Sequence, residues 1–354
     1  MTVTVDDVRN ALSQIAIPDG KTLISGDLVR AIQVDGATVR FVIEAPSSEV
    51  ARHMEPVRKA AEAAVASLPG VDVVSVALTA HGPAAPAPSG VRIGGHPKKQ
   101  TGSIKPSGVA RILAVGSGKG GVGKSTVSTN LAVALARAGR RVGLLDADIY
   151  GPSVPRMMGV SERPKSEDDT IIPLQAHGVT VMSIGLMLPE EKAVIWRGPM
   201  LMGALQQMLS QVAWGTLDVL IVDLPPGTGD VAMTLCQKAQ VTGAIVVSTP
   251  QDVALLDARK ALDMFETLKT PVLGLIENMA VFTCPHCGGQ SHIFGAGGVA
   301  EEAERRDVPL LAQLPLDLDT RLAGDGGVPV AAGDGPLADA YAVLADRLID
   351  GGMA

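Results

Sequence analysis

The sequence has few aromatic residues: four Phe, two Trp and two Tyr make up 2% of its 354 residues. A surface that stacks nucleic-acid bases or encloses a quaternary ammonium group therefore has little to build with. Basic residues are also in deficit, since 30 Lys and Arg stand against 37 Asp and Glu and leave a net charge of −7. This charge repels phosphodiester backbones and anionic lipid, so we expect neither a nucleic acid nor a membrane as partner.

Cysteine is scarce as well, and three residues in so long a chain exclude a disulfide framework and favour a reducing compartment. The sequence contains no run of about 18 apolar residues, the length a membrane-spanning helix needs. Its first ten residues carry two acids where a signal peptide needs positive charge. We therefore expect a cytoplasmic protein, and its 46% hydrophobic composition is sufficient for a large aliphatic core.

Composition and periodicity divide the chain into three segments. Residues 1–80 alternate helical and strand patterns, which predicts a small α+β domain. Residues 81–107 are dense in Pro, Gly and Ala and lack an apolar period, which is typical of a linker, and residues 108–354 form a second domain. Within the first segment we expect helices over residues 5–15 and 48–68, a turn at residues 18–20, and strands over residues 37–43 and 71–78.

The second domain alternates short β-branched runs with helical stretches. Most of the strand candidates are apolar almost throughout, as in strands covered on both faces. We therefore expect an α/β fold with a doubly wound, mainly parallel sheet, in which ligands bind at the carboxyl ends of the strands. The expected strands are 111–115, 141–146, 217–223, 243–249, 271–278 and 310–314, and the expected helices are 124–138, 199–211, 231–240, 252–268 and 300–306.

A phosphate-binding loop follows the first of these strands. The run GKGGVGKS satisfies the pattern G-x-x-x-x-G-K-[ST] and opens directly into a helix, which predicts a P-loop NTPase. Glycines let backbone N–H groups converge on phosphate oxygens, Lys124 reaches the β and γ oxygens, and Ser125 binds Mg²⁺. The expected nucleotide-binding residues are Gly118, Lys119, Gly120, Gly121, Val122, Gly123, Lys124, Ser125 and Thr126.

Three carboxylates stand where a phosphate-loop enzyme needs them. Asp146 and Asp148 follow the second strand, and Asp223 ends the apolar run LDVLIVD. Asp148 is the candidate for orienting the attacking water or a Mg²⁺-bound water, and Asp223 fits a Walker B carboxylate that holds Mg²⁺ through water. Each acid alone is equally compatible with a helix cap or a turn. Residues 151–153 and 225–230, which follow these acids, are candidate switch segments that sense the γ-phosphate.

Cys284 and Cys287 form a CxxC pair in a glycine-rich turn, a spacing that lets two thiolates bind one metal centre. One pair supplies only two of the four ligands of a tetrahedral zinc or an iron–sulfur cluster. Either His286 and His292 complete a zinc site, or a second pair comes from another subunit. A redox pair and an inert surface loop are further alternatives. Cys236 lies in a helical pattern among apolar neighbours and is expected in the core.

The form GKGGVGKS, with its early lysine, resembles the deviant Walker A loop of the MinD/ParA/nitrogenase-iron-protein class of ATPases. With DADIYGPS, WRGPM (residues 196–200), VDLPPGTGD and CPHCGG in this order over about residues 112–315, the chain resembles the Mrp/ApbC-type iron–sulfur cluster carriers. The N-terminal segment is similar to a small domain that precedes the ATPase in many of these proteins, for which we expect partner docking.

This resemblance implies an ATP-sandwiched homodimer in which Lys119 reaches the partner's nucleotide, and it makes Lys119, Lys124 and Asp148 the catalytic residues. It implies that Asn278 contacts adenine beside a second base-side loop at residues 315–317. It also implies a labile [4Fe–4S] cluster held by Cys284 and Cys287 of each subunit. The cluster passes from the assembly machinery to apo iron–sulfur proteins, and slow ATP hydrolysis is coupled to the transfer.

The alternative interpretation is a positioning or regulatory switch ATPase with the same loop and with structural zinc or no metal at the CxxC. Such proteins act on DNA or membranes, and the net charge disfavours DNA. Residues 337–349 lack the basic amphipathic face of a membrane anchor. The acidic run at residues 167–169 is expected to be solvated.

Overall fold

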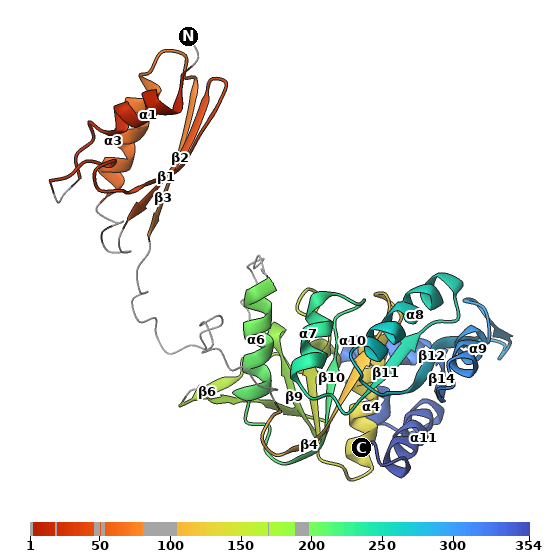
Figure 1. The fold of residues 1–354 in the computed structure, drawn as a ribbon. Helices are drawn as coiled ribbons and strands as arrows, with labels where there is room; N and C mark the ends of the chain where they lie inside the picture. The colour runs from red at the N-terminus through yellow and green to blue at the C-terminus, as the bar shows by residue number, and fades with distance from the viewer. Residues whose placement is uncertain are drawn as a thin grey trace. The chain divides into compact units, whose positions relative to one another are not determined.

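The computed structural model describes residues 3–17, 20–45, 50, 54–80, 105–168, 170–187 and 198–354. The chain divides into two compact units, Met1–Gly90 and Val91–Ala354 (Figure 1). Parts of several sequence predictions lie outside the described residues. These are positions 18 and 19 of the expected turn, residues 48, 49 and 51–53 of the expected helix 48–68, residues 81–104 of the expected linker, position 169 of the acidic run, and Trp196 and Arg197 of the WRGPM run.

The N-terminal unit contains α1 (Val5–Leu12), β1 (Val29–Asp35), β2 (Thr38–Ala45), α3 (Glu55–Ala66) and β3 (Val73–Ala80). Strand β2 lies in the middle of the sheet, antiparallel to β1 and parallel to β3. Alternate residues of β2 are buried together with side chains of both helices, so the helices cover one face of the sheet. This is the small α+β fold expected from the sequence, with β1 as a strand that the pattern did not reveal.

The helix expected over residues 48–68 is not continuous in the described residues, because Met54 is not helical and α3 covers Glu55–Ala66. Met54 precedes the helix with φ −91° and ψ 0°, and Pro56 occupies its first turn. Proline has no amide hydrogen, and its ring clashes with the carbonyl four residues earlier in a continuous helix. A helix that includes Pro56 therefore starts close to it.

The second unit is built on a sheet with the order β13-β12-β11-β4-β10-β5-β9-β8, with β14 also paired to β12. Its pairs are parallel except for β12 with β13 and β8 with β9. The strands are β4 (Val109–Gly116), β5 (Val142–Asp146), β8 (Leu174–Ala176), β9 (Val179–Ser183), β10 (Leu217–Asp223), β11 (Gly243–Ser248), β12 (Val272–Thr283), β13 (Gln290–Ser291) and β14 (Leu310–Leu316), and a separate hairpin pairs β6 (Lys165–Glu167) with β7 (Thr170–Ile172).

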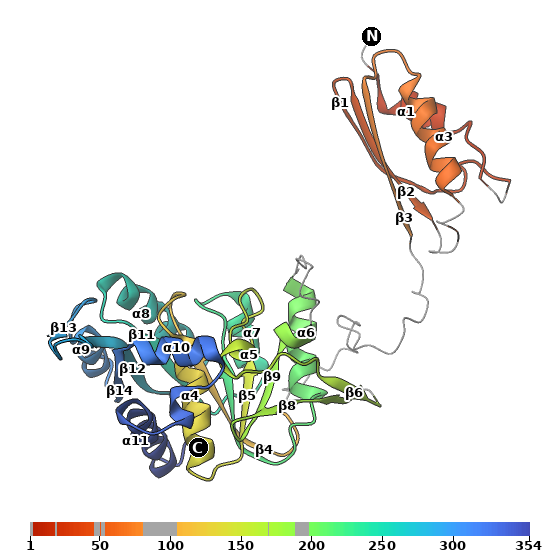
Figure 2. The same cartoon turned by 180° about the vertical axis from the view of Figure 1, so that it is seen from behind.

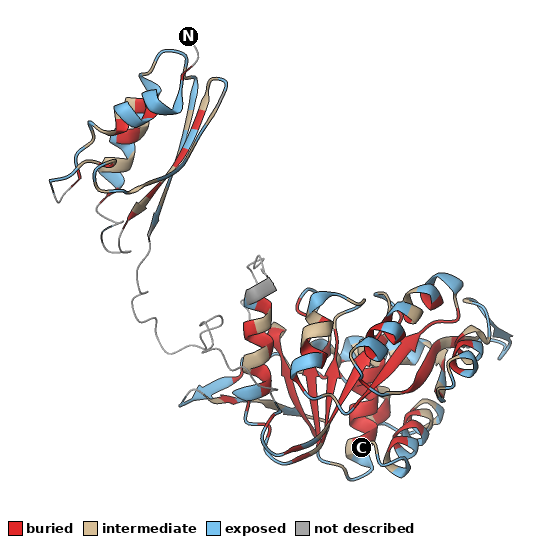
Figure 3. Ribbon diagram, viewed as in Figure 1, coloured by how far each residue is buried: buried red, intermediate tan, exposed pale blue. Residues whose placement is uncertain are grey.

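Helices cover both faces of this sheet, as Figure 2 shows from behind. One buried cluster joins the sheet to α6, α7, α8 and α9, and a second joins it to α4, α5 and α11. The central strands β4, β5, β9, β10 and β11 are buried along nearly their whole length (Figure 3). The fold is therefore the doubly wound, mainly parallel P-loop NTPase sheet that the sequence predicts. The helices are α4 (Lys124–Arg137), α5 (Val154–Met157), α6 (Gly198–Ser210), α7 (Asp230–Lys238), α8 (Asp252–Thr267), α9 (Gly298–Arg305), α10 (Leu318–Gly326) and α11 (Pro336–Asp350).

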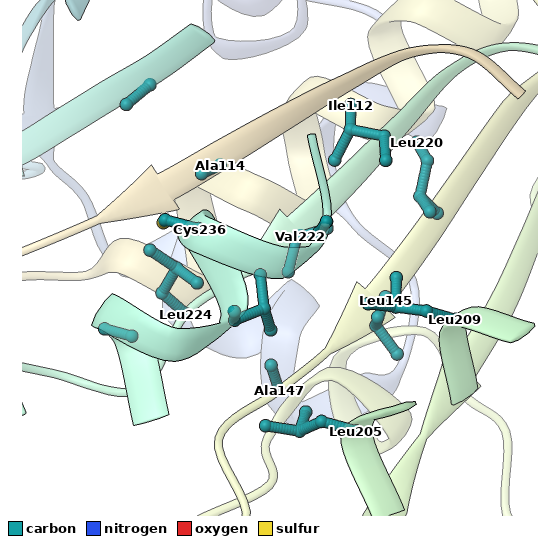
Figure 4. Close-up of a cluster of buried hydrophobic side chains, with 14 of the residues drawn as sticks. Ile112, Ala114, Leu145, Ala147, Leu205, Leu209, Leu220, Val222, Leu224 and Cys236 are labelled. Atoms are coloured by element: carbon teal, nitrogen blue, oxygen red, sulfur yellow. The ribbon is translucent and has the colours of Figure 1, made fainter. Parts of the chain in front are cut away.

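Cys236 belongs to the first of these clusters. Figure 4 shows it on α7 among aliphatic side chains that include Ala114, Val222 and Leu224. Burial raises the pKa of its thiol to about 12, so the side chain remains a protonated thiol at neutral pH. The prediction that Cys236 is a core residue is confirmed.

The C-terminal helix α11 packs its apolar side against α4. Its buried residues include Tyr341, Leu344 and Leu348, at helical spacing. Across the described residues, no helix has both the length and the apolar character needed to cross a bilayer. The apolar face of residues 337–349 is therefore used inside the fold.

Candidate functional site

The phosphate loop connects β4, in the middle of the sheet, to α4. Gly121 and Gly123 adopt left-handed φ values of 81° and 84°, which side chains other than glycine rarely tolerate. Helix α4 then starts at Lys124 and runs for 14 residues, so its N-terminal amides and partial positive charge lie at the loop. This backbone has the geometry that cradles phosphate oxygens.

Two glycines of the loop are required by close neighbours. A Cβ added at Gly118 would lie 2.0 Å from the carbonyl carbon of Asp257 in α8. A Cβ at Gly123 would lie 2.1 Å from Nδ2 of Asn278. The loop is thus packed against α8 at Gly118 and against Asn278 of β12 at Gly123.

Asp223, at the end of β10, is the centre of a buried polar network. Its Oδ2 lies 2.7 Å from Nζ of Lys124 and accepts a 2.6 Å hydrogen bond from Oγ of Ser125. Its Oδ1 accepts a 2.6 Å hydrogen bond from Ser128 on the next turn of α4. A carboxylate and a hydroxyl placed this closely fit Mg²⁺, which prefers oxygen ligands.

Asp146 lies opposite Asp223 in the register of the paired strands β5 and β10. Its carboxylate accepts hydrogen bonds from Ser183 Oγ at 3.1 Å and from the backbone amides of Asp148 at 3.0 Å and Val154 at 3.3 Å. Burial, followed by the charge of Asp223, raises the pKa of Asp146 to about 7. Asp146 therefore fixes the backbone at Asp148 and Val154, on either side of the candidate switch segment at residues 151–153.

A cavity of about 240 Å³ lies over the phosphate loop. Its wall combines loop residues with both candidate switch segments and includes Lys119, Lys124, Asp148, Ser153 and Pro226. A second cavity of about 440 Å³ shares four wall residues with the first, namely Gly123, Thr126, Ser153 and Met157. The two cavities therefore adjoin. The sequence analysis expects phosphates at the first cavity and the base at the second, which we call the base-side cavity.

Asn278 and residues 315–317 line the second cavity. Pro315 and Leu316 belong to β14 rather than to the turn expected there, and Asp317 directly precedes α10. Nδ2 of Asn278 donates a 2.9 Å hydrogen bond to the carbonyl of Val122, which ties the middle of β12 to the phosphate loop. Asp317 caps α10 by accepting from the amides of Asp319 and Thr320 at 2.7 and 3.1 Å. The structure thus brings together the two base-side segments that the sequence analysis named.

Lys119 lies apart from the buried charges. Its Nζ donates a 3.4 Å hydrogen bond to Oε1 of Gln251, the residue before α8. It also lines the cavity over the loop. An amine in this position is separate from the Asp223 network that Lys124 joins.

The cysteine pair lies in the turn of the hairpin formed by β12 and β13. Phe282 pairs with Ser291 and Thr283 with Gln290, and the Cys284 amide donates to the Gly289 carbonyl at 2.9 Å. Both thiols are free, with Cys284 half-buried and Cys287 exposed. Hydrogen bonds from the backbone amides of His286 and Cys287, and then from the Cys287 side chain, lower the pKa of Cys284. The turn therefore presents two neighbouring sulfurs to solvent and favours a thiolate.

No further ligand completes this pair within the described part of the chain, where no group of three or more His, Cys, Asp or Glu side chains is placed to hold a metal ion. His292 Nδ1 lies 2.9 Å from the carbonyl of Ala280, inside the hairpin. The zinc site formed with His286 and His292 is not assembled here.

The chain matches two known protein families. Residues 108–349 match the model of the NUBPL iron-transfer P-loop NTPase family, and residues 5–78 match the iron–sulfur cluster assembly protein family. The chain belongs to the NUBPL iron-transfer P-loop NTPase family. This membership confirms the family resemblance that the loop, switch and CxxC motifs indicated.

Relatives with curated names agree with this membership. An iron–sulfur cluster carrier protein of Haemophilus influenzae is 51% identical over 245 residues, which are 68% of this chain and 66% of that protein. One of Helicobacter pylori is 43% identical over 335 residues, 93% of this chain and 87% of that protein. Among solved structures, a nucleotide-binding protein of Archaeoglobus fulgidus in complex with ADP is 40% identical, covers 65% of this chain and 90% of its own, and has a TM-score of 0.57.

Sequence reasoning missed several residues that shape the site of this NUBPL-family chain. Ser128 bonds to Asp223, Ser183 to Asp146, and Gln251 to Lys119. Ser128 had a signal, because it follows Ser125 on the same face of α4. Ser183 and Gln251 had none, since each comes from a distant strand or loop.

Proposed function

We propose that this protein binds and hydrolyses ATP as a homodimer, carries a labile [4Fe–4S] cluster on Cys284 and Cys287 of each subunit, and transfers it to apo iron–sulfur proteins. The observation that carries the proposal is that β12 contains Asn278, which lines the base-side cavity, and leads directly into the turn that holds Cys284 and Cys287. Relatives at 51% and 43% identity are named iron–sulfur cluster carrier proteins, which supports the same cargo.

The ATPase part rests on the network around Asp223. Nζ of Lys124 lies 2.7 Å from Oδ2 of Asp223, and phosphate oxygens can replace this carboxylate as its partner. Lys124 is therefore placed to bind the β and γ phosphate oxygens. Ser125 directly, and Asp223 through water, would hold Mg²⁺, which neutralises developing charge on the phosphates. Asp148 lines the same cavity and is proposed to orient the attacking water.

The proposal of a dimer rests on the cysteine pair, which supplies too few ligands for a cluster, and on Lys119, which has only one weak hydrogen-bond partner among the described residues. A cluster of this type takes four thiolates, and the described hairpin offers two. Lys119 bonds only weakly to Gln251, at 3.4 Å, and is proposed to reach the partner's nucleotide. A two-fold axis between two hairpins supplies the second thiolate pair without any new residue.

The N-terminal unit matches a cluster assembly family and contains no cysteine in residues 1–80. It cannot bind a cluster through thiolates, so its proposed role is docking to the assembly machinery or to recipient proteins. We propose the domain limits 1–80 and 108–354, with residues 81–107 as linker. Free surface thiols persist in a reducing compartment, which supports the cytoplasm as the proposed location.

Anaerobic reconstitution with iron and sulfide tests the cargo. Iron and acid-labile sulfide are measured on the wild type, on the Cys284→Ala/Cys287→Ala double variant and on Cys236→Ala, with the mass determined by size-exclusion chromatography. We expect about four iron and four sulfide per dimer in the wild type and in Cys236→Ala, and none in the double variant. Zinc without sulfide, or a cluster retained by the double variant, would refute cluster carriage.

Coupling is tested by transfer to an apo-ferredoxin with and without Mg-ATP. We expect Lys124→Ala to keep its cluster, lose ATP hydrolysis and show no ATP effect on the transfer rate. An unchanged ATP effect in that variant would separate hydrolysis from transfer.

A further inference from the structure

Strand β12 changes direction at Met279. This residue has φ 59°, a left-handed value that is uncommon for a non-glycine residue and is unusual inside a strand. The pairing of β12 with β14 shifts register between Asn278 and Phe282, across the same position. A residue held in such a conformation is maintained by its surroundings and is often found at functional sites.

The part of β12 before Met279 is firmly attached to the core. Glu277 is buried, and its carboxylate accepts from the amide of Val299 at 3.1 Å and from Nε2 of Gln313 at 2.8 Å. Asn278 bonds to the carbonyl of Val122 in the phosphate loop. Three separate segments therefore fix the strand up to residue 278.

The part after Met279 is a hairpin that bonds mainly to itself. Ala280 is linked to His292, Phe282 pairs with Ser291, and the amide of Cys284 bonds to Gly289. The chain returns to the core through Gly295 and Gly297, with φ values of 90° and 76°. Both covalent connections of the hairpin thus contain left-handed residues.

Two of the hairpin's attachments lie in the wall of the base-side cavity. Met279 lines that cavity directly, and so does Leu316, which pairs with Phe282 of the hairpin arm. A base that fills this cavity contacts both attachments at once. Such contacts restrict the orientation of the hairpin, and with it the two cysteines.

We propose that Met279 is a positioning residue whose left-handed backbone transmits occupancy of the nucleotide pocket to the cysteine pair. The inference rests on the proposed function, since it takes a nucleotide in this cavity and cargo on these thiols. An adenine nucleotide seated against Met279 and Leu316 holds the hairpin in one orientation. In the nucleotide-free chain the hairpin samples several orientations about the bend.

The test uses the full-length, cluster-free protein and measures thiol alkylation. N-ethylmaleimide is added with and without saturating Mg-ADP, and the rate at Cys284 and Cys287 is followed by mass spectrometry. ADP is chosen because the inference concerns the base end of the site and needs no γ-phosphate. Cys236, which is buried, reports unfolding in every variant, since it reacts only when the core opens.

Two substitutions of Met279 have opposite backbone preferences. Valine is β-branched and strongly disfavours a left-handed φ, whereas asparagine adopts it readily. Lys269→Val is the matched control, because Lys269 has φ 54° in an exposed turn and does not line either cavity.

We expect ADP to slow alkylation about fivefold in the wild type, in Lys269→Val and in Met279→Asn. In Met279→Val we expect the ratio of the two rates to fall to about one. A Met279→Val protein that folds, binds ADP and keeps the wild-type ratio would overturn the proposal. So would a wild type that binds ADP without any change in the rate.

Hydrogen exchange of the wild type covers the case in which Met279→Val does not fold. ADP is expected to slow exchange of amides 280–292, and unchanged exchange there overturns the proposal. Calorimetry and cluster reconstitution are run on the same preparation. If ADP or the cluster does not bind, the proposed function itself fails, whereas binding of both with unaltered thiol rates rejects only the role of Met279.

Discussion

The contact between the phosphate loop and α8 makes the sharpest prediction. In a Gly118→Ala variant the new Cβ would lie 2.0 Å from the carbonyl carbon of Asp257, 2.2 Å from its oxygen and 2.4 Å from the nitrogen of Ala258. Carbon atoms prefer separations of about 3.5–4.0 Å, so the loop and the helix must move apart by roughly 1.5 Å. All three neighbours are backbone atoms, which cannot rotate away as a side chain does.

Overpacking of this kind costs about 1–3 kcal/mol, and we expect the upper end because the atoms that the new Cβ meets are all backbone. For a unit of this size, about 3 kcal/mol corresponds to a fall in Tm of roughly 6–12 °C. Gly120→Ala is the matched control, because its nearest neighbour, Pro226 Cγ, is 4.0 Å away and its φ is not left-handed. We expect its unfolding free energy to stay within about 1 kcal/mol of the wild type.

Thermal unfolding followed by tryptophan fluorescence measures the effect, since both tryptophans belong to residues 91–354. ADP titration calorimetry then asks whether the shifted loop binds nucleotide more weakly. Equal Tm values for the Gly118 and Gly120 variants would refute the packing argument, because the two substitutions add the same methyl group to the same loop.

Three further predictions concern charges and hydrogen bonds of the site. Because burial raises the pKa of Asp146 to about 7, the folded chain holds a proton that the unfolded chain has already released in this pH range. The unfolding free energy of the nucleotide-free protein, measured by urea titration, should therefore fall as the pH rises from about 4 to 7, and the slope should be smaller in Asp146→Asn. Asn278→Ala leaves the buried carbonyl of Val122 without its partner and should lower the unfolding free energy by about 1–3 kcal/mol and weaken ADP binding, whereas an unchanged urea midpoint would contradict the contact. Lys119→Ala should keep ADP affinity within about threefold but reduce phosphate release about a hundredfold, while Lys124→Ala should lose both; equal ADP losses in the two variants would show that Lys119 serves its own subunit's site.

The sequence predicted the parts of the fold that depend on local signals. The strand expected at residues 217–223 matches β10 in both bounds, because a buried aliphatic run ends there at Asp223 and two prolines follow. The helix expected at residues 124–138 ends one residue earlier, at Arg137. Glycine, proline and aliphatic runs act within a few residues, so these boundaries are visible in the sequence.

Features fixed by distant partners were not visible. Strand β12 was expected to end at Asn278 and instead continues to Thr283, because β13 and β14 pair with its extension. Strand β9 was missed, although all five of its residues are buried, since a run this short has no distinctive period. The left-handed backbone of Met279 had no signal either, because methionine does not favour that conformation.

Because Lys124 forms an ion pair with Asp223, the carboxylate competes with the phosphates of a nucleotide for Lys124. Each phosphate group that takes the lysine must first displace Asp223, which is wholly buried and would be left as an uncompensated charge. A divalent cation bound with the nucleotide would supply the counter-charge that Asp223 loses when Lys124 turns to the phosphates. The exchange of Lys124 from Asp223 to the phosphates would therefore favour binding of the metal–nucleotide complex over the free nucleotide, before any hydrolysis.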